Sequence, residues 1–186
     1  MTEDTQTASA FSAPDLFYLE HRAQIEEWAD LRRGASLAID HHLRGAMSEL
    51  RDHDPEWTIA GDLPQRYSGV VLAPASVDRP ASVLIGAFWK PSTVMPAVRP
   101  DAPFVGIHVE PTQFEARASQ TLDRIDSEDA NGPHDTYKTA PPWIRWRYVV
   151  ADERWWEKPN TYSQQLAGEV TALLARYGQA LSSLTS

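Results

Sequence analysis

The chain has 186 residues, of which 42% are hydrophobic and 10% aromatic, enough for one domain with a hydrophobic core. Its formal net charge is −9, which argues against a dedicated non-specific nucleic-acid binder, because acidic surfaces repel phosphates. The absence of cysteine excludes disulfides and thiolate metal sites. Residues 1–8 show no secretory-signal pattern and no apolar run is long enough for a membrane span, so we expect a cytoplasmic protein without membrane contact.

Residues 1–14 are polar and lack periodicity, which predicts a disordered tail. Next, apolar residues recur at helical spacing around His21, which we expect to be a hydrogen-bonded core histidine. These residues are Phe17, Ile25, Trp28 and Leu31. Two arginines and a glycine at 32–34 predict a helix end, after which Ser36 caps a second helix. The second stripe is Ile39, Leu43, Met47 and Leu50, and the pattern fits either a helical hairpin or one long broken helix.

From Trp57 the apolar period changes to two, which indicates strands at 67–72, 82–89 and 104–110. In the second of these strands, one face is expected to hold Val83, Ile85, Ala87 and Trp89. The opposite face carries Leu84 and Phe88, so this strand should be central. In the third strand, Val105, Ile107 and Val109 are expected to point inward and His108 and Glu110 outward.

A helix is predicted from Thr112, followed by a polar loop at 126–140, a fourth strand at 143–150 and a last helix capped by Asn160 or Thr161. The two helical stripes are Phe114, Ala118, Leu122 and Ile125, then Leu166, Val170, Leu173, Leu174, Tyr177 and Leu181. The order α-α-β-β-β-α-β-α with short early links predicts an α+β domain over residues 15–186. Its sheet should be mostly antiparallel, with the helices packed on one face.

The predicted strand 143–150 lies where the net charge of the chain turns positive, and its two faces differ. Alternation places Trp143, Arg145 and Arg147 on one face. The other face takes Ile144, Trp146, Tyr148 and Val150. Because two arginines cannot cheaply face a core, we expect the first set to point outward and to bind a partner. The alternative is cross-strand packing of arginine stems over tryptophan rings.

Trp155 and Trp156 are adjacent residues in a loop, so their rings should point apart. We expect one ring to be buried in the core and the other to be exposed, which makes this loop the second candidate for partner binding. The alternative is a lid over the end of the sheet.

His108 and Glu110 share a strand face and are candidate acid–base residues if a cleft covers them; otherwise they are solvated. His42, Glu49 and His53 are candidate metal ligands, although a solvated helix end explains the pattern better. The chain has no nucleophile elbow, phosphate-binding loop, dinucleotide fingerprint or HExxH motif. We therefore expect no cofactor and no metal, and we favour a protein that is not an enzyme.

The order of several features resembles an uncharacterised bacterial α+β domain, found C-terminally in some PD-(D/E)XK nuclease-associated proteins. The features, spanning residues 36–185, are Trp57 at a hairpin, strand 105–110 before a helix, Trp143-x-x-Trp146, the tryptophan loop and the last helix. The chain lacks the Asp…Glu-x-Lys triad of the nucleases, because Phe88 stands two residues before Lys90. The resemblance therefore implies an accessory role beside a nuclease or defence system. A looser likeness is to small acidic secretion chaperones, which dimerise.

These observations predict a bacterial, non-enzymatic interaction or assembly module. It would bind a protein partner, or itself as a homodimer, through the aromatic and arginine face of the sheet. One alternative is an accessory nucleic-acid-binding component of a nuclease or phage-defence system, which the net charge disfavours. Another is an enzyme with an acid–base cleft at His108 and Glu110.

Overall fold

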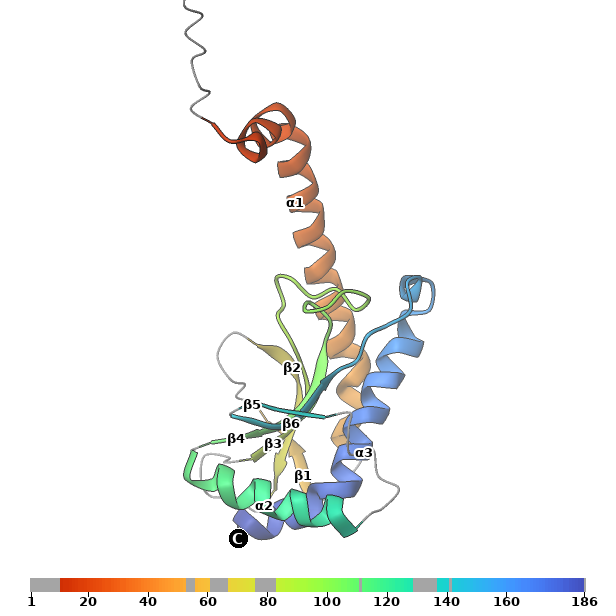
Figure 1. Cartoon of the computed structure of the whole chain (residues 1–186). Coiled ribbons are helices and arrows are strands. Elements are labelled where there is room, and N and C mark those ends of the chain that lie inside the picture. The colour runs from red at the N-terminus through yellow and green to blue at the C-terminus, as the bar shows by residue number, and fades with distance from the viewer. Residues whose placement is uncertain are drawn as a thin grey trace, which may run out of the picture. The chain divides into compact units, whose positions relative to one another are not determined.

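The structure is a computed structural model of the chain (Figure 1). It describes residues 11–52, 56–60, 67–75, 83–110, 112–128, 137–140 and 142–185. It divides into two compact units, of which the first ends at Ala35 and the second begins at Ser36. The tail predicted at 1–14 lies mostly outside the described residues, since only its last four residues are described.

The N-terminal helix α1 is a single helix, Ala13–Ala46, followed by the 3-10 helix η1, Met47–Asp52. Its start is capped reciprocally, because the Ser12 backbone N–H donates to the Asp15 carboxylate at 2.9 Å and the Asp15 N–H donates to Ser12 Oγ at 3.4 Å. The predicted helix end at 32–34 is wrong. A glycine inside a helix costs about 1 kcal/mol but does not by itself stop it. The structure therefore contains the long helix rather than the hairpin.

Burial differs between the two parts of α1. Every side chain from Phe11 to Ala35 is exposed except Ile25, which is partly buried. His21 is exposed as well, so its assignment to the core is wrong; its ring centroid lies 4.5 Å from that of Phe17. The second predicted stripe is confirmed as part of the core of the second unit, where Ile39, Leu43, Met47 and Leu50 are buried.

Six antiparallel strands form one sheet in the order β1-β2-β3-β4-β6-β5. The strands are β1 (Trp57–Ile59), β2 (Ser68–Pro74), β3 (Val83–Trp89), β4 (Phe104–Val109), β5 (Lys138–Ala140) and β6 (Trp143–Tyr148). Two further helices are α2 (Thr112–Glu128) and α3 (Pro159–Thr185). The predicted α+β class, the order of helices and strands and the antiparallel sheet are confirmed. The short edge strands β1 and β5 were not predicted.

The helices α2 and α3 and the buried end of α1 pack on one face of the sheet (Figure 1). The core between them contains the alternating residues predicted for β3 and β4 and the apolar stripes of α2 and α3. Burial of each Leu, Val or Ile side chain contributes roughly 1.5–3 kcal/mol, so this layer holds the fold together. One carboxylate lies inside it: Asp40 accepts a hydrogen bond from Trp89 Nε1 at 2.7 Å and pairs with Arg44.

The opposite face of the sheet carries a second apolar cluster, and no residue of a described helix belongs to it. Two glycines, Gly86 and Gly106, lie directly opposite each other there, on β3 and β4. A Cβ added at Gly106 would lie 2.8 Å from both Trp146 Cβ and the Arg145 carbonyl oxygen. Only glycine therefore allows β6 to approach β4 so closely at this point.

Candidate functional site: the aromatic face and the arginines behind it

A register shift in β6 decides which of its side chains share a face. Tyr148, Arg147, Trp146 and Arg145 pair in turn with residues 104–107 of β4, but the next pair is His108 with Trp143. Ile144 is therefore an extra residue, as in a β-bulge. Because one extra residue reverses the alternation, Trp143 joins the face of Trp146 and Tyr148.

The expectation that Trp143, Arg145 and Arg147 share an outward face is therefore wrong. Arg145 and Arg147 lie on the face that the helices cover, opposite Ile107 and Val105. The Arg145 side chain is only 12% exposed. Two arginines can face the helices because each has a carboxylate there, which composition alone does not reveal.

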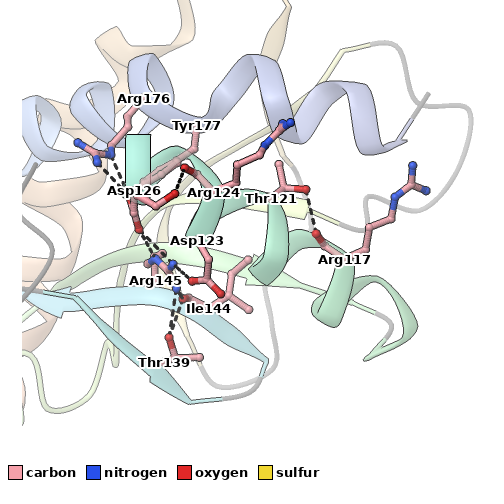
Figure 2. Close-up of polar contacts among 11 residues, drawn as sticks. Arg117, Thr121, Asp123, Arg124, Asp126, Thr139, Ile144, Arg145, Arg176 and Tyr177 are labelled. Carbon is pink, nitrogen blue, oxygen red and sulfur yellow. Dashed lines mark hydrogen bonds and ion pairs between the residues drawn. The ribbon is translucent and has the colours of Figure 1, made fainter. Parts of the chain in front are cut away.

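Arg145 connects β6 to helix α2, as Figure 2 shows. Its Nε donates to Asp126 Oδ2 at 3.1 Å and its Nη2 to Asp123 Oδ1 at 2.5 Å. A third bond runs from Nη1 to the carbonyl oxygen of Ile144, the extra residue of the bulge, at 2.9 Å. The guanidinium therefore also holds the irregular part of the strand in place.

Asp126 is the centre of this network, since it also accepts hydrogen bonds from helix α3 (Figure 2). Arg176 Nη2 donates to Asp126 Oδ1 at 2.9 Å, and the Tyr177 hydroxyl donates to the same oxygen at 2.6 Å. Burial would raise the pKa of Asp126, but hydrogen bonds from Tyr177, Arg176 and Arg145 hold that pKa below its ordinary value. Asp126 thus stays ionised and joins β6, α2 and α3.

Arg147 makes the equivalent connection from β6 to α3 through Glu169. Its guanidinium carbon also lies 5.4 Å from the ring centroid of Tyr137. Both arginines therefore form ion pairs with carboxylates of the same chain. Their predicted role in partner binding is untested, but their geometry assigns them to holding the helices on the sheet.

Six aromatic side chains form what we call the aromatic face: Tyr67, Phe88, Phe104, Trp143, Trp146 and Tyr148. Phe104 is its centre, with the other five ring centroids 4.9–6.3 Å from its own. Phe88 and Phe104 are buried, whereas the other four rings are partly exposed. Edge-to-face contacts of this kind each contribute about 0.5–1.5 kcal/mol beyond area burial, so the exposed rings rest on a rigid base.

The Trp143 ring packs against aromatic side chains of both β3 and β4. Its ring centroid lies 4.9 Å from that of Phe104 and 4.7 Å from that of His108, which lie two residues before and after Gly106 on the same face of β4. It also contacts Phe88 on β3, with the centroids 4.5 Å apart. Trp143 thus makes edge-to-face contacts with rings on two strands, which fix its orientation.

Two exposed cations border the aromatic face. Lys138 Nζ lies 5.5 Å from the Trp146 ring centroid, and the guanidinium carbon of Arg99 lies 5.7 Å from that of Tyr148. The Trp146 Nε1 atom is buried and has no acceptor among the described residues. Buried indole N–H groups usually find a hydrogen-bond partner. This one is therefore an exception within the described part of the chain.

A small cavity of about 90 Å³ opens at the Phe104 and Tyr148 end of the aromatic face. Its wall includes Trp89, Lys90 and Asp101 as well as these two rings. A water molecule occupies roughly 30 Å³ of liquid, so the cavity has room for one side chain of a partner.

His108 and Glu110 do not form a covered acid–base pair. His108 is 4% exposed, and Trp143 packs against its ring, whereas the Glu110 carboxylate is largely exposed. The distance from His108 Nε2 to Glu110 Oε1 is 3.5 Å. Burial lowers the pKa of His108, although the charge of Glu110 opposes this. Neither residue lines the cavity beside Phe104 and Tyr148 or the one beside Trp155.

The tryptophan loop behaves as expected. Trp155 is partly buried against the core, with its ring centroid 5.9 Å from that of Tyr162, whereas Trp156 is 60% exposed. Both belong to the 3-10 helix η2, Trp155–Glu157. A cavity of about 250 Å³ lies beside Trp155 and Tyr162. Partner binding by the two tryptophans remains a prediction.

The candidate metal ligands do not come together among the described residues. The half-buried His42 lies with its Nε2 3.2 Å from Ser163 Oγ on α3. The Glu49 side chain and His53 lie outside the described residues. Within the described part of the chain, no three His, Asp or Glu residues are grouped closely enough to hold a metal ion.

No family model, curated protein or solved structure matches this chain. The resemblance to the nuclease-associated domain therefore remains a prediction. None of the described helices combines the length and apolar character that a membrane span requires.

Sequence reasoning missed Asp126 and the register shift. Asp126 was assigned to a polar loop, but α2 continues to Glu128. The adjacent Arg176 and Tyr177 on the last helix offered a signal, because buried Arg and Tyr groups need an acceptor. A β-bulge has no comparable mark in a single sequence.

Proposed function

We propose that this chain is a protein-interaction module that binds its partner on the aromatic face. The observation that carries the proposal is the set of four partly exposed rings on a rigid aromatic base, on the side of the sheet where no described helix packs. Rigid aromatic side chains lose little conformational entropy on binding and are enriched at the centres of protein interfaces. The arginines, in contrast, already have partners inside the chain.

The cavity at the aromatic face is smaller than those that hold small molecules or cofactors, which favours a protein partner at this face. Pockets for such ligands usually measure 300–1,000 Å³. The cavity at the end of the aromatic face measures about 90 Å³ and the one beside Trp155 about 250 Å³. The smaller cavity suits a single anchoring side chain of such a partner.

Single-stranded nucleic acid is the second candidate ligand. Bases stack on exposed aromatic rings, and Lys138 and Arg99 lie beside two of them. The net charge of −9 opposes this candidate, because binding of phosphates requires a basic surface.

The resemblance noted in the sequence suggests a component of a nuclease or defence system as the protein partner.

The proposal is tested by co-expressing the chain with the products of neighbouring genes and measuring the affinity of any pair that co-purifies. Replacing Trp146 and Tyr148 together by alanine should raise the dissociation constant more than thirtyfold, since a hot-spot residue contributes about 2 kcal/mol or more. Leu37→Ala is the control, because this side chain is 54% exposed but belongs neither to the aromatic face nor to the tryptophan loop. Unchanged affinity in a folded Trp146→Ala/Tyr148→Ala variant would contradict the proposal.

The nucleic-acid candidate has its own readout, the fluorescence anisotropy of labelled single-stranded DNA and RNA. Affinity that falls steeply with salt and is lost in the same double variant would replace the protein partner with nucleic acid. No change in anisotropy at low salt would remove this candidate.

A further inference from the structure

The first part of α1, residues 13–35, exposes large apolar side chains along one stripe. Phe17 is 60% exposed, Trp28 65% and Leu31 64%. A helix in water owes most of its stability to the packing of an apolar face, and single helices of this length are only marginally stable. The stripe therefore calls for a partner surface.

The spacing of the stripe is that of a coiled-coil seam. Its positions alternate four and three residues apart: Phe17, His21, Gln24, Trp28, Leu31 and Ala35. None of these six residues is Asp, Glu, Lys or Arg. Such a narrow 4-3 repeat is typical of a helix that pairs with another helix, whereas a helix on a globular core shows a broader apolar face.

The opposite face of the same segment does not have this character. Leu16, Leu19 and Ala23 lie there, but Glu26 and Asp30 follow, so the apolar residues do not continue along that face. Their surroundings are therefore those of a solvated face.

The charges beside the seam indicate the partner and its direction. Glu20 and Glu27 flank the seam on one side. The other side carries Tyr18, Ile25 and Arg32, which recur every seven residues. In a parallel, in-register pair of identical helices, Glu27 of each copy faces Arg32 of the other, which gives two opposite-charge pairs. In an antiparallel pair, Glu20 of each copy faces Glu27 of the other, which gives two like-charge pairs.

We propose that residues 13–35 pair with the same segment of a second copy of this chain as a parallel, in-register, two-helix coiled coil. The segment is about 34 Å long at 1.5 Å per residue and presents three heptads. The resulting dimer has two-fold symmetry, so each copy supplies the same seam. This surface shares no residue with the aromatic face.

Sedimentation velocity over a concentration series tests the dimer with the full chain. The wild-type chain should be dimeric, and Trp28→Glu should be monomeric because it places a charge in the seam. Leu19→Glu is the matched control: it introduces the same charge at an exposed leucine of the same segment, on the opposite face, and should remain dimeric. A monomeric wild type, or an unchanged dimer in Trp28→Glu, overturns the proposal.

A charge swap tests the direction of the pair. Glu27→Arg should raise the dimer dissociation constant about tenfold, because two exposed pairs change sign. The double variant Glu27→Arg/Arg32→Glu should restore the wild-type dissociation constant of the dimer. Tighter dimerisation of Glu27→Arg would indicate the antiparallel pair, in which residue 27 faces Glu20, and would overturn the parallel arrangement.

The chain has no cysteine, so one engineered thiol reports the register. Ala35→Cys should form an intermolecular disulfide under mild oxidation, since parallel copies place residue 35 against itself. Leu19→Cys, away from the seam, should not. The Trp146→Ala/Tyr148→Ala variant should still dimerise, so loss of dimerisation through the seam and loss of partner binding are separate outcomes.

Discussion

Strand β6 presents different kinds of side chain on the two faces of the sheet. On the covered face, Arg145 and Arg147 are held by carboxylates on α2 and α3. On the other face, Trp143, Trp146 and Tyr148 pack on phenylalanines and keep part of each ring exposed. Ion pairs thus hold the helices on one face, and aromatic surface stays partly exposed on the other. A charged residue near an exposed aromatic in sequence need not share its role, because one extra residue in a strand separates them.

The largest effect is expected on the covered face, from Asp126→Ala. This change leaves Arg145 and Arg176 without their shared acceptor, and removing one partner of a buried pair costs about 3–5 kcal/mol. Urea unfolding should show this loss in the free energy of unfolding. Asp123→Ala is the control, because Asp123 is exposed and its pair with Arg145 should contribute about 1 kcal/mol or less. Equal losses of unfolding free energy in the two variants would contradict the difference between the buried Asp126 and the exposed Asp123.

Gly106→Ala tests the close approach of β4 and β6. The new Cβ would meet the Arg145 carbonyl oxygen and Trp146 Cβ at 2.8 Å, so the strands must shift, which typically costs about 1–3 kcal/mol. Gly34→Ala is the control, since a Cβ there meets nothing within 4 Å, and alanine favours a helix by up to about 1 kcal/mol. A thermal melt in which both variants are as stable as the wild type would contradict the packing described for Gly106.

The smallest effect concerns His108, which lies under Trp143. Burial lowers the pKa of His108 in the folded state, so below its ordinary value of 6.5 the unfolded chain binds more protons. Stability should therefore fall as the pH is lowered from about 7 to 5, by at most about 1.4 kcal/mol per pH unit for this proton. In His108→Gln this contribution should be absent. An identical slope in the two proteins would show that His108 is accessible to water when folded.

The sequence predicts the elements that obey a simple period. The faces of β3 and the stripe of α3 follow directly from apolar residues at intervals of two and of three to four. The continuity of α1 through Gly34 could not be predicted, because a helix end depends on the chain beyond the glycine.

The candidate site was predicted only in part. Trp143 and Trp156 are exposed to some degree, as expected, but the orientation of Arg145 depends on Asp126, 19 residues earlier in the chain. Long-range acceptors and register shifts arise from tertiary packing and leave no local pattern.

The most direct test of this account is the set of proton contacts that the Trp143 ring makes, measured by NOE spectroscopy on the folded chain. The account predicts contacts with the rings of Phe88, Phe104 and His108. Contacts between Trp143 and the methyl groups of Leu122 on α2 would contradict it. They would mean that β6 alternates without a shift, so that Trp143 shares the helix-covered face with Arg145 and Arg147 and does not belong to the aromatic face.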